Sequence, residues 1–343
     1  MEKPKDRDFI ETAEGLLFCV VGYLHPPDRY TAYLKYLPAA DGKWSRGETR
    51  YARAIPYYHV SQVEETYALL RERYPRYLFS CPVRNITVSS VPRAMVKTYY
   101  RPRRRLRSLL AEGAGDALEQ RLIDLVTLLS DLSGLSDGDF GVTGSLLTGS
   151  HSPEFSDMDI TVYGLRASQG LKAALIEAAK VGGAIQTLSR ERMAGWSLNR
   201  TGRFPLRFEE LMDIAERRWN YGLYRGAYFS VHPVRTDGEI TERYGDRIYR
   251  QRGVAAGTAE IKDSRESIYL PAIYRVENAE VEAAARGEVE QVVSYEGLFC
   301  DIFEEGERIE FRGVLEEVSG DGGHCRVVVG AAGSGGGYIK SAA

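Results

Sequence analysis

The chain has 343 residues, with 45 basic and 48 acidic side chains and a formal charge of −3 at pH 7. This near balance excludes a globally basic nucleic-acid coat protein but leaves room for a local basic groove. Hydrophobic residues make up 43% of the chain and charged residues 27%, so it can bury a sizeable core and is not disordered overall. A chain of this length predicts two or three domains.

The sequence predicts neither a membrane span nor secretion. It has no run of about 18 apolar residues, and its charged first residues lack the apolar centre of a signal peptide. The cysteines lie far apart, without the CxxC or Cys/His spacing of a zinc module. We therefore expect a reducing cytoplasm as the simplest location. The four cysteines are Cys19, Cys81, Cys300 and Cys325.

Residues 1–100 have the pattern of a small N-terminal α/β module. Apolar runs at 15–24 and 30–37, separated by turn residues, predict two strands. Residues 60–74 have the spacing of a helix that Pro75 ends.

Residues 101–257 alternate between helix and strand signals and predict a central α/β unit. The strongest helix signal is a leucine stripe at 117–132, and further helices are expected at 169–181 and 208–219. Strands are expected at 139–143, 158–163 and 227–234.

Residues 258–343 change character and predict a C-terminal β-rich domain, a small barrel or sandwich. Its glycine-rich stretch 330–337 is expected to be a flexible tail. The expected strands are 267–276, 289–295, 308–318 and 324–329.

A basic run opens the central unit, and two interpretations stay open. It is either the solvated start of a helix after Pro102 or a patch that contacts the phosphates of RNA or DNA. Tyr99 and Tyr100, just before it, could stack on bases. The arginines of the run are Arg101, Arg103, Arg104, Arg105 and Arg107.

The stretch 141–164 carries the chemistry of the chain. Gly144 and Ser145 directly follow a predicted strand and open a helix-like segment. A glycine there lets the backbone approach an oxyanion, and the first amides of the turn, with the Ser145 hydroxyl, would donate to it. Gly149 permits a tight turn within the same short element. The pattern predicts a binding place for a triphosphate.

Two carboxylates follow, Asp157 and Asp159. In a strand, residues two apart share a face, with Cα atoms roughly 7 Å apart. Such a pair beside a phosphate site is a hard oxygen site for Mg²⁺ or Mn²⁺. Two such ions would activate an attacking hydroxyl and stabilise departing pyrophosphate. The alternative is that the aspartates merely close a turn.

Gly-Ser, then eleven residues, then Asp-x-Asp in a strand resembles the signature of the DNA polymerase β-like nucleotidyltransferase superfamily. The second glycine and the serine before the first aspartate belong to the resemblance. It implies transfer of NMP from an NTP to a hydroxyl, with Asp157 and Asp159 as catalytic metal ligands. The residues it implies at the nucleotide are Gly144, Ser145, Gly149 and Ser156.

The resemblance implies an α/β (α+β) protein, with a polymerase β-like core between the N-terminal α/β module and the C-terminal β-rich domain. The three-part organisation also resembles uncharacterised archaeal proteins with a predicted nucleotidyltransferase domain. No dinucleotide-binding or P-loop motif is present.

The family usually carries a third carboxylate on a later strand. At 227–234 this sequence offers Ser230 and His232 instead, which leaves Asp237, in the turn beyond, as the candidate third metal ligand. Two functions therefore stay open.

One is an enzyme whose acceptor is an RNA or DNA end, a small molecule or a protein hydroxyl. The other is a catalytically degenerate, nucleotidyltransferase-like nucleic-acid-binding protein. A carboxylate from another strand beside the aspartates would favour the enzyme, whereas an apolar or histidine side chain would favour the binding protein.

Overall fold

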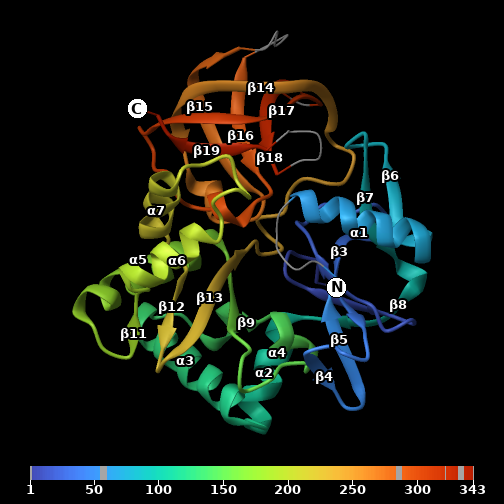
Figure 1. Cartoon of the computed structure of the whole chain (residues 1–343), viewed down its shortest axis with the longest axis vertical. Coiled ribbons are helices and arrows are strands. Elements are labelled where there is room, and N and C mark those ends of the chain that lie inside the picture. The colour runs from blue at the N-terminus through green and yellow to red at the C-terminus, as the bar shows by residue number, and fades with distance from the viewer. Residues whose placement is uncertain (1, 55–59, 283–287, 321, 331–335, 343) are drawn as a thin grey trace. The chain divides into compact units, whose positions relative to one another are not determined.

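The structure is a computed structural model that describes residues 2–54, 60–282, 288–320, 322–330 and 336–342. It is a mixed α+β protein, as predicted, and it has more strand than helix (Figure 1). The chain forms two compact units, of residues 1–56, 89–188 and 219–241, and of residues 57–88, 189–218 and 242–343. Each unit draws on three chain segments, so the compact units differ from the three consecutive domains expected.

The helices and strands within the described residues have these bounds. The helices are α1 (Val60–Arg73), α2 (Pro102–Glu112), α3 (Ala117–Ser133), α4 (Gly144–Thr148), α5 (Leu165–Val181), α6 (Arg190–Leu198) and α7 (Phe208–Arg217). The strands are β1 (Phe9–Thr12), β2 (Leu17–Val20), β3 (Arg29–Pro38), β4 (Trp44–Arg46), β5 (Thr49–Arg53), β6 (Leu78–Cys81), β7 (Ile86–Pro92), β8 (Val96–Tyr100), β9 (Phe140–Val142), β10 (Met158–Tyr163), β11 (Ile185–Gln186), β12 (Tyr221–Tyr224), β13 (Ala227–Val234), β14 (Ile248–Asp263), β15 (Ala272–Val281), β16 (Val289–Ser294), β17 (Arg308–Ser319), β18 (His324–Val329) and β19 (Tyr338–Ser341).

The first unit holds a five-stranded sheet in the order β11-β12-β13-β10-β9. β10 runs parallel to β13 and antiparallel to β9. Ile160 and Val162 of β10 are fully buried in one core with leucines of α3 and α5, so the apolar face of the sheet is the one expected. Because side chains alternate along a strand, Asp159 of β10 lies on the opposite side.

Strands β1 to β5 and β8 belong to this same unit. They form a sheet in the order β4-β5-β3-β2-β1-β8, and Leu147 of α4 is buried in one cluster with Phe9, Leu17 and Tyr36 from it. The N-terminal strands therefore pack against the element that follows β9.

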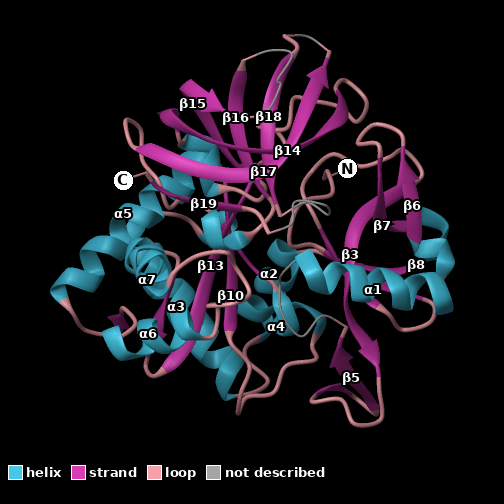
Figure 2. Ribbon diagram, turned by 45° about the horizontal axis from the view of Figure 1, so that its top comes forward, coloured by secondary structure: helices cyan, strands magenta, loops and turns pink. Residues whose placement is uncertain are grey.

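The second unit is built on a closed ring of paired strands, β14-β15-β16-β18-β17, which returns to β14 (Figure 2). Leu211 and Ile214 of the amphipathic helix α7 are buried in its core with Phe299 and Phe311. The expected β-rich fold of the C-terminal region is therefore present, in the form of a small barrel.

Several elements differ from the expectations. The predicted boundary at residue 257 falls inside β14, a strand that the sequence analysis missed over its whole length. Arg250, Gln251 and Arg252 give its first half no apolar pattern. Residues 338–341, just after the predicted flexible tail, pair with β17 as strand β19, while residues 331–335 of that stretch lie outside the described residues. All four cysteines are free, and every described helix is too short or too polar to span a lipid bilayer.

Candidate functional site

The predicted turn follows β9 and is tied to β10. The Thr143 amide donates to the Asp159 carbonyl oxygen at 2.8 Å. Gly144 opens α4 with φ of +67°, and a Cβ atom at this position would lie 2.2 Å from Asp159 Oδ2. Only a glycine fits both this backbone conformation and this close approach. The Asp159 side chain therefore faces the turn, as the sequence predicts.

Asp159 is held from the neighbouring strand β13. The Ser230 hydroxyl donates to Asp159 Oδ1 at 2.6 Å and lies 2.8 Å from His232 Nε2, and the same nitrogen is 3.6 Å from Asp159 Oδ1. Asp157, by contrast, makes no hydrogen bond or ion pair with the described residues. Beside the aspartates β13 thus presents a serine and a histidine rather than a third carboxylate.

The two carboxyls have opposite pKa shifts. Burial raises the pKa of Asp157 to about 6, and the negative charge of Asp159 adds to this, while Arg53 opposes it. Burial also acts to raise the pKa of Asp159, but contacts with His232 and Ser230 and the charge of Lys35 outweigh it and hold that pKa below its ordinary value. Burial lowers the pKa of His232 to about 4, so this imidazole is neutral at pH 7.

Two basic side chains from the N-terminal strands act on the aspartates, and the sequence analysis missed both. Lys35, on β3, is buried, and its charge lowers the pKa of Asp159. Arg53, at the end of β5, lowers that of Asp157. A lysine inside an otherwise apolar strand was the signal available for Lys35, because lysine is rarely buried without a charged or polar partner.

The predicted nucleotide residues have different surroundings. Ser145 is buried beside Gly144, and its hydroxyl makes no hydrogen bond with the described residues. Gly149 ends α4 in the left-handed conformation, which is the tight turn expected. The Ser156 hydroxyl accepts from the Ser152 amide at 2.9 Å and so closes the loop before β10. Ser145 therefore keeps a free hydroxyl for a ligand, whereas Ser156 has a structural partner.

Asp237 does not join the aspartates. β10 and β13 are parallel, with Asp159 opposite Ser230, and Asp237 follows the far end of β13. It lies seven residues beyond Ser230, which corresponds to about 20 Å of extended chain. There it forms an ion pair with Lys5. Within the described residues, no group of three or more His, Cys, Asp or Glu side chains could hold a metal ion.

The arginines of residues 101–107 differ in their surroundings, because some form ion pairs and others are exposed without one. Arg105 pairs with Glu119 and donates to the Leu146 carbonyl at 3.2 Å. Arg101 pairs with Glu2 at 3.1 Å. Among the described residues, neither Arg104 nor Arg107 has a hydrogen bond or ion pair, and both are exposed.

One known protein matches the chain along nearly its whole length. The uncharacterised protein MJ1086 of Methanocaldococcus jannaschii is 30% identical over 333 residues, which cover 96% of this chain and 96% of that protein. No protein-family model matches, and no solved structure matches significantly.

Proposed function

We propose that this chain, which belongs to the same family as its archaeal relative MJ1086, is a Mg²⁺-dependent nucleotidyltransferase with a polymerase β-like core. It would transfer NMP from an NTP to a hydroxyl acceptor and release pyrophosphate. One observation carries the proposal: the Asp159 carboxylate lies directly against Gly144, at the turn that bears the free Ser145 hydroxyl.

The side chains present fit one divalent cation better than two. Mg²⁺ is usually held by one or two carboxylates, with waters and substrate phosphate oxygens in the other positions. Asp157 and Asp159 supply that number, and the pKa of Asp157, raised by burial and by Asp159, indicates negative charge that a cation would offset. When bound, Mg²⁺ would stabilise the charge that develops on the phosphates. Mn²⁺ suits the same oxygen ligands.

Residues of this chain would also bind the triphosphate and hold Asp159 in place. The turn at Gly144 and the Ser145 hydroxyl would bind the triphosphate, while Lys35 adds a buried positive charge beside Asp159. The acceptor hydroxyl would then lose its proton to solvent, and its oxygen would form a bond to the α-phosphorus as the bond from this phosphorus to pyrophosphate breaks. Ser230 and His232 would keep Asp159 oriented and ionised.

A second candidate function is a catalytically degenerate nucleic-acid-binding protein with the same core. The observation that favours it is the pair Ser230 and His232, which occupies the side of Asp159 where a third carboxylate was sought. This protein would bind RNA or DNA in a salt-dependent way without turnover.

One experiment separates the two functions. The full chain is incubated with Mg²⁺, each labelled NTP in turn, and a pool of RNA and small-molecule acceptors, and incorporation of labelled NMP is measured. The enzyme should incorporate label, and chelation of Mg²⁺ should stop it.

Asp157→Asn and Asp159→Asn should each abolish incorporation, whereas Asp131→Asn, at an exposed position of α3, should not. Full activity in either of the first two variants would refute the proposal. RNA binding without incorporation in the unaltered chain would favour the second function.

A further inference from the structure

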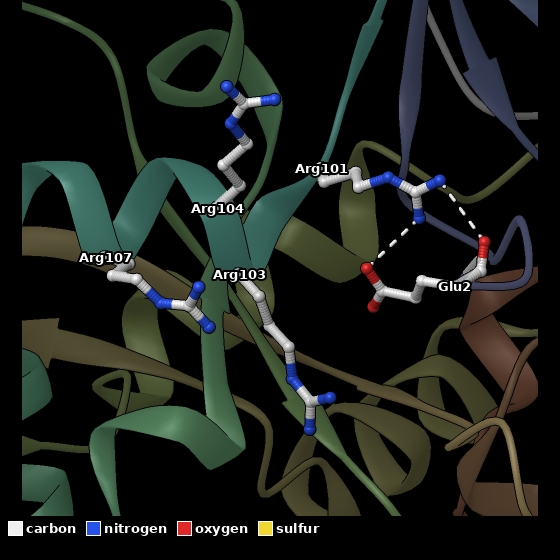
Figure 3. Close-up of a pocket in the computed structure, with 5 residues that line it drawn as sticks. All are labelled: Glu2, Arg101, Arg103, Arg104 and Arg107. Atoms are coloured by element: carbon white, nitrogen blue, oxygen red, sulfur yellow. Dashed lines mark hydrogen bonds and ion pairs between the residues drawn. The ribbon is translucent and has the colours of Figure 1, made fainter.

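A cavity of about 400 Å³ lies at the start of α2. Its volume is in the range of ligand sites, roughly 300–1,000 Å³. Four cationic side chains and one anionic one line it, which leaves an excess of positive charge. Its lining residues are Glu2, Arg101, Arg103, Arg104 and Arg107 (Figure 3).

The cationic groups of this arginine pocket are only partly neutralised. Arg101 donates to the Glu2 carboxylate at 3.1 Å and to the Glu2 carbonyl at 3.2 Å, as Figure 3 shows. Arg104 and Arg107, which are three apart and therefore neighbours on the helix surface, have no ion pair among the described residues. The pocket thus offers at least two guanidinium groups to an anion.

Arg103 separately indicates that the pocket lacks a hydrogen-bond acceptor. Its guanidinium stacks on the Tyr163 ring at 3.9 Å, while its Nε atom is buried and has no hydrogen-bond partner among the described residues. An unpaired buried donor costs about 1–3 kcal/mol.

The pocket lies on the same face of the sheet as the aspartates. Tyr163 follows Asp159 by four residues on β10, so both side chains project to one side, about 13 Å apart along the strand. The start of α2 lies there too, because a Cβ atom on Gly141 would approach both the Arg103 amide and the Thr161 hydroxyl closely, at 2.8 and 2.6 Å.

We propose that the arginine pocket binds backbone phosphates of a single-stranded nucleic acid, whose terminal hydroxyl is then the acceptor at Asp157 and Asp159. This inference rests on the proposed function and specifies its acceptor class. A strand that passes along this face from the aspartates would bring later phosphates to the pocket. Arg105, which pairs with Glu119, takes no part, so four of the five arginines of the run contribute.

The Glu2 carboxylate would compete with a bound phosphate for Arg101. Its carboxylate takes donors of Arg101 that a phosphate would otherwise use. Removing that charge should therefore strengthen binding, whereas removing arginines should weaken it. A variant that merely unfolds cannot bind more tightly, so the Glu2 substitution tests the inference independently of stability.

The test measures the Kd of a fluorescent single-stranded RNA for the full chain by anisotropy, without NTP or Mg²⁺, over a range of salt concentrations. The Arg104→Ala/Arg107→Ala variant should raise Kd at least about tenfold. It should also flatten the slope of log K against log salt by about 1.4, since each phosphate contact on a single strand contributes about 0.7. Glu2→Gln should lower Kd.

The control is Arg190→Ala/Arg192→Ala, which removes two exposed charges from α6 and should leave Kd unchanged. An unchanged Kd in the Arg104/Arg107 variant, or an equal loss in the control, would overturn the inference. Binding of inorganic tripolyphosphate that RNA cannot displace would also overturn it, in favour of a small ligand. Because the assay needs no turnover, its result stands apart from failure of the proposed catalysis.

Discussion

Gly144 and Asp159 are in direct contact, backbone against carboxylate. A Cβ atom on Gly144 would come within 2.2 Å of Asp159 Oδ2, and the glycine has φ of +67°. The contact couples the turn that would bind phosphate to the side chain that would bind a metal ion, so a change in one should displace the other.

Gly144→Ala should therefore lose both stability and activity. A non-glycine residue in the left-handed region costs about 1–2 kcal/mol, and the clash with Asp159 adds to this. We expect the free energy of unfolding, measured with urea, to fall by at least about 2 kcal/mol, and NMP incorporation to be lost.

The matched control is Gly134→Ala. Gly134 ends α3 with φ of +68° and has open space around its Cβ position, so its substitution should cost only the backbone strain. Equal losses of stability in the two variants would contradict a close approach of Gly144 to Asp159.

Ser230→Ala should lower NMP incorporation roughly tenfold or more. It removes the 2.6 Å hydrogen bond to Asp159 Oδ1, and hydrogen bonds to charged groups contribute about 1.5–3 kcal/mol, where 1.36 kcal/mol is a factor of ten in rate.

Ser108→Ala is the control for Ser230. Its hydroxyl donates to a carboxylate at a similar distance, 2.7 Å to Glu112 Oε1, but on an exposed helix surface. It should leave the rate of NMP incorporation unchanged. A Ser230 variant with undiminished NMP incorporation would show that this hydroxyl does not support Asp159.

The buried carboxyl of Asp8 should make the free energy of unfolding fall as pH rises. Burial raises its pKa to about 7, against the hydrogen bond donated by Tyr99 at 2.7 Å. The folded chain then holds the Asp8 proton where the unfolded chain, with a pKa near 3.8, has released it. This contribution to stability is complete below about pH 4 and is lost as pH rises to about 7.

Asp8→Asn should remove that loss. The free energy of unfolding is measured with urea at a series of pH values for wild type and for Asp8→Asn. The wild-type value minus the variant value should fall by a few kcal/mol as pH rises from about 4 to about 7. Asp131→Asn, at an exposed site, should leave the wild-type dependence intact. Parallel curves for wild type and Asp8→Asn would contradict a raised pKa.

Glu316 and Arg326 form a buried ion pair between β17 and β18, with 2.8 Å from Arg326 Nη2 to Glu316 Oε2. Glu316→Ala should cost about 3–5 kcal/mol, because it leaves the guanidinium buried and unpaired. Glu316→Leu/Arg326→Met should be much less harmful. Urea unfolding measures both, and an equally destabilised double variant would refute this explanation.

Local patterns predicted the individual elements of the candidate site well. The expected strands 158–163 and 227–234 coincide with β10 and β13, because apolar residues fill one face of each and turn residues bound them. The approach of Asp159 to the turn was also predictable, since both lie within one short stretch of chain. β14 was missed over its whole length. A strand held in a closed barrel by backbone hydrogen bonds needs no continuous apolar pattern, and the first half of β14 is polar.

The sequence by itself determined an α+β protein in which Asp159 projects from a strand toward a Gly-Ser turn, because strand alternation and glycine geometry act over a few residues. Only the tertiary structure decided the neighbours of those carboxylates. Parallel pairing set Ser230 and His232 beside Asp159 and carried Asp237 to the far end of β13, while folding of the N-terminal strands brought Lys35 and Arg53 close enough to shift the pKa values. Electrostatic interaction depends on distance in space, which no pattern along the chain contains.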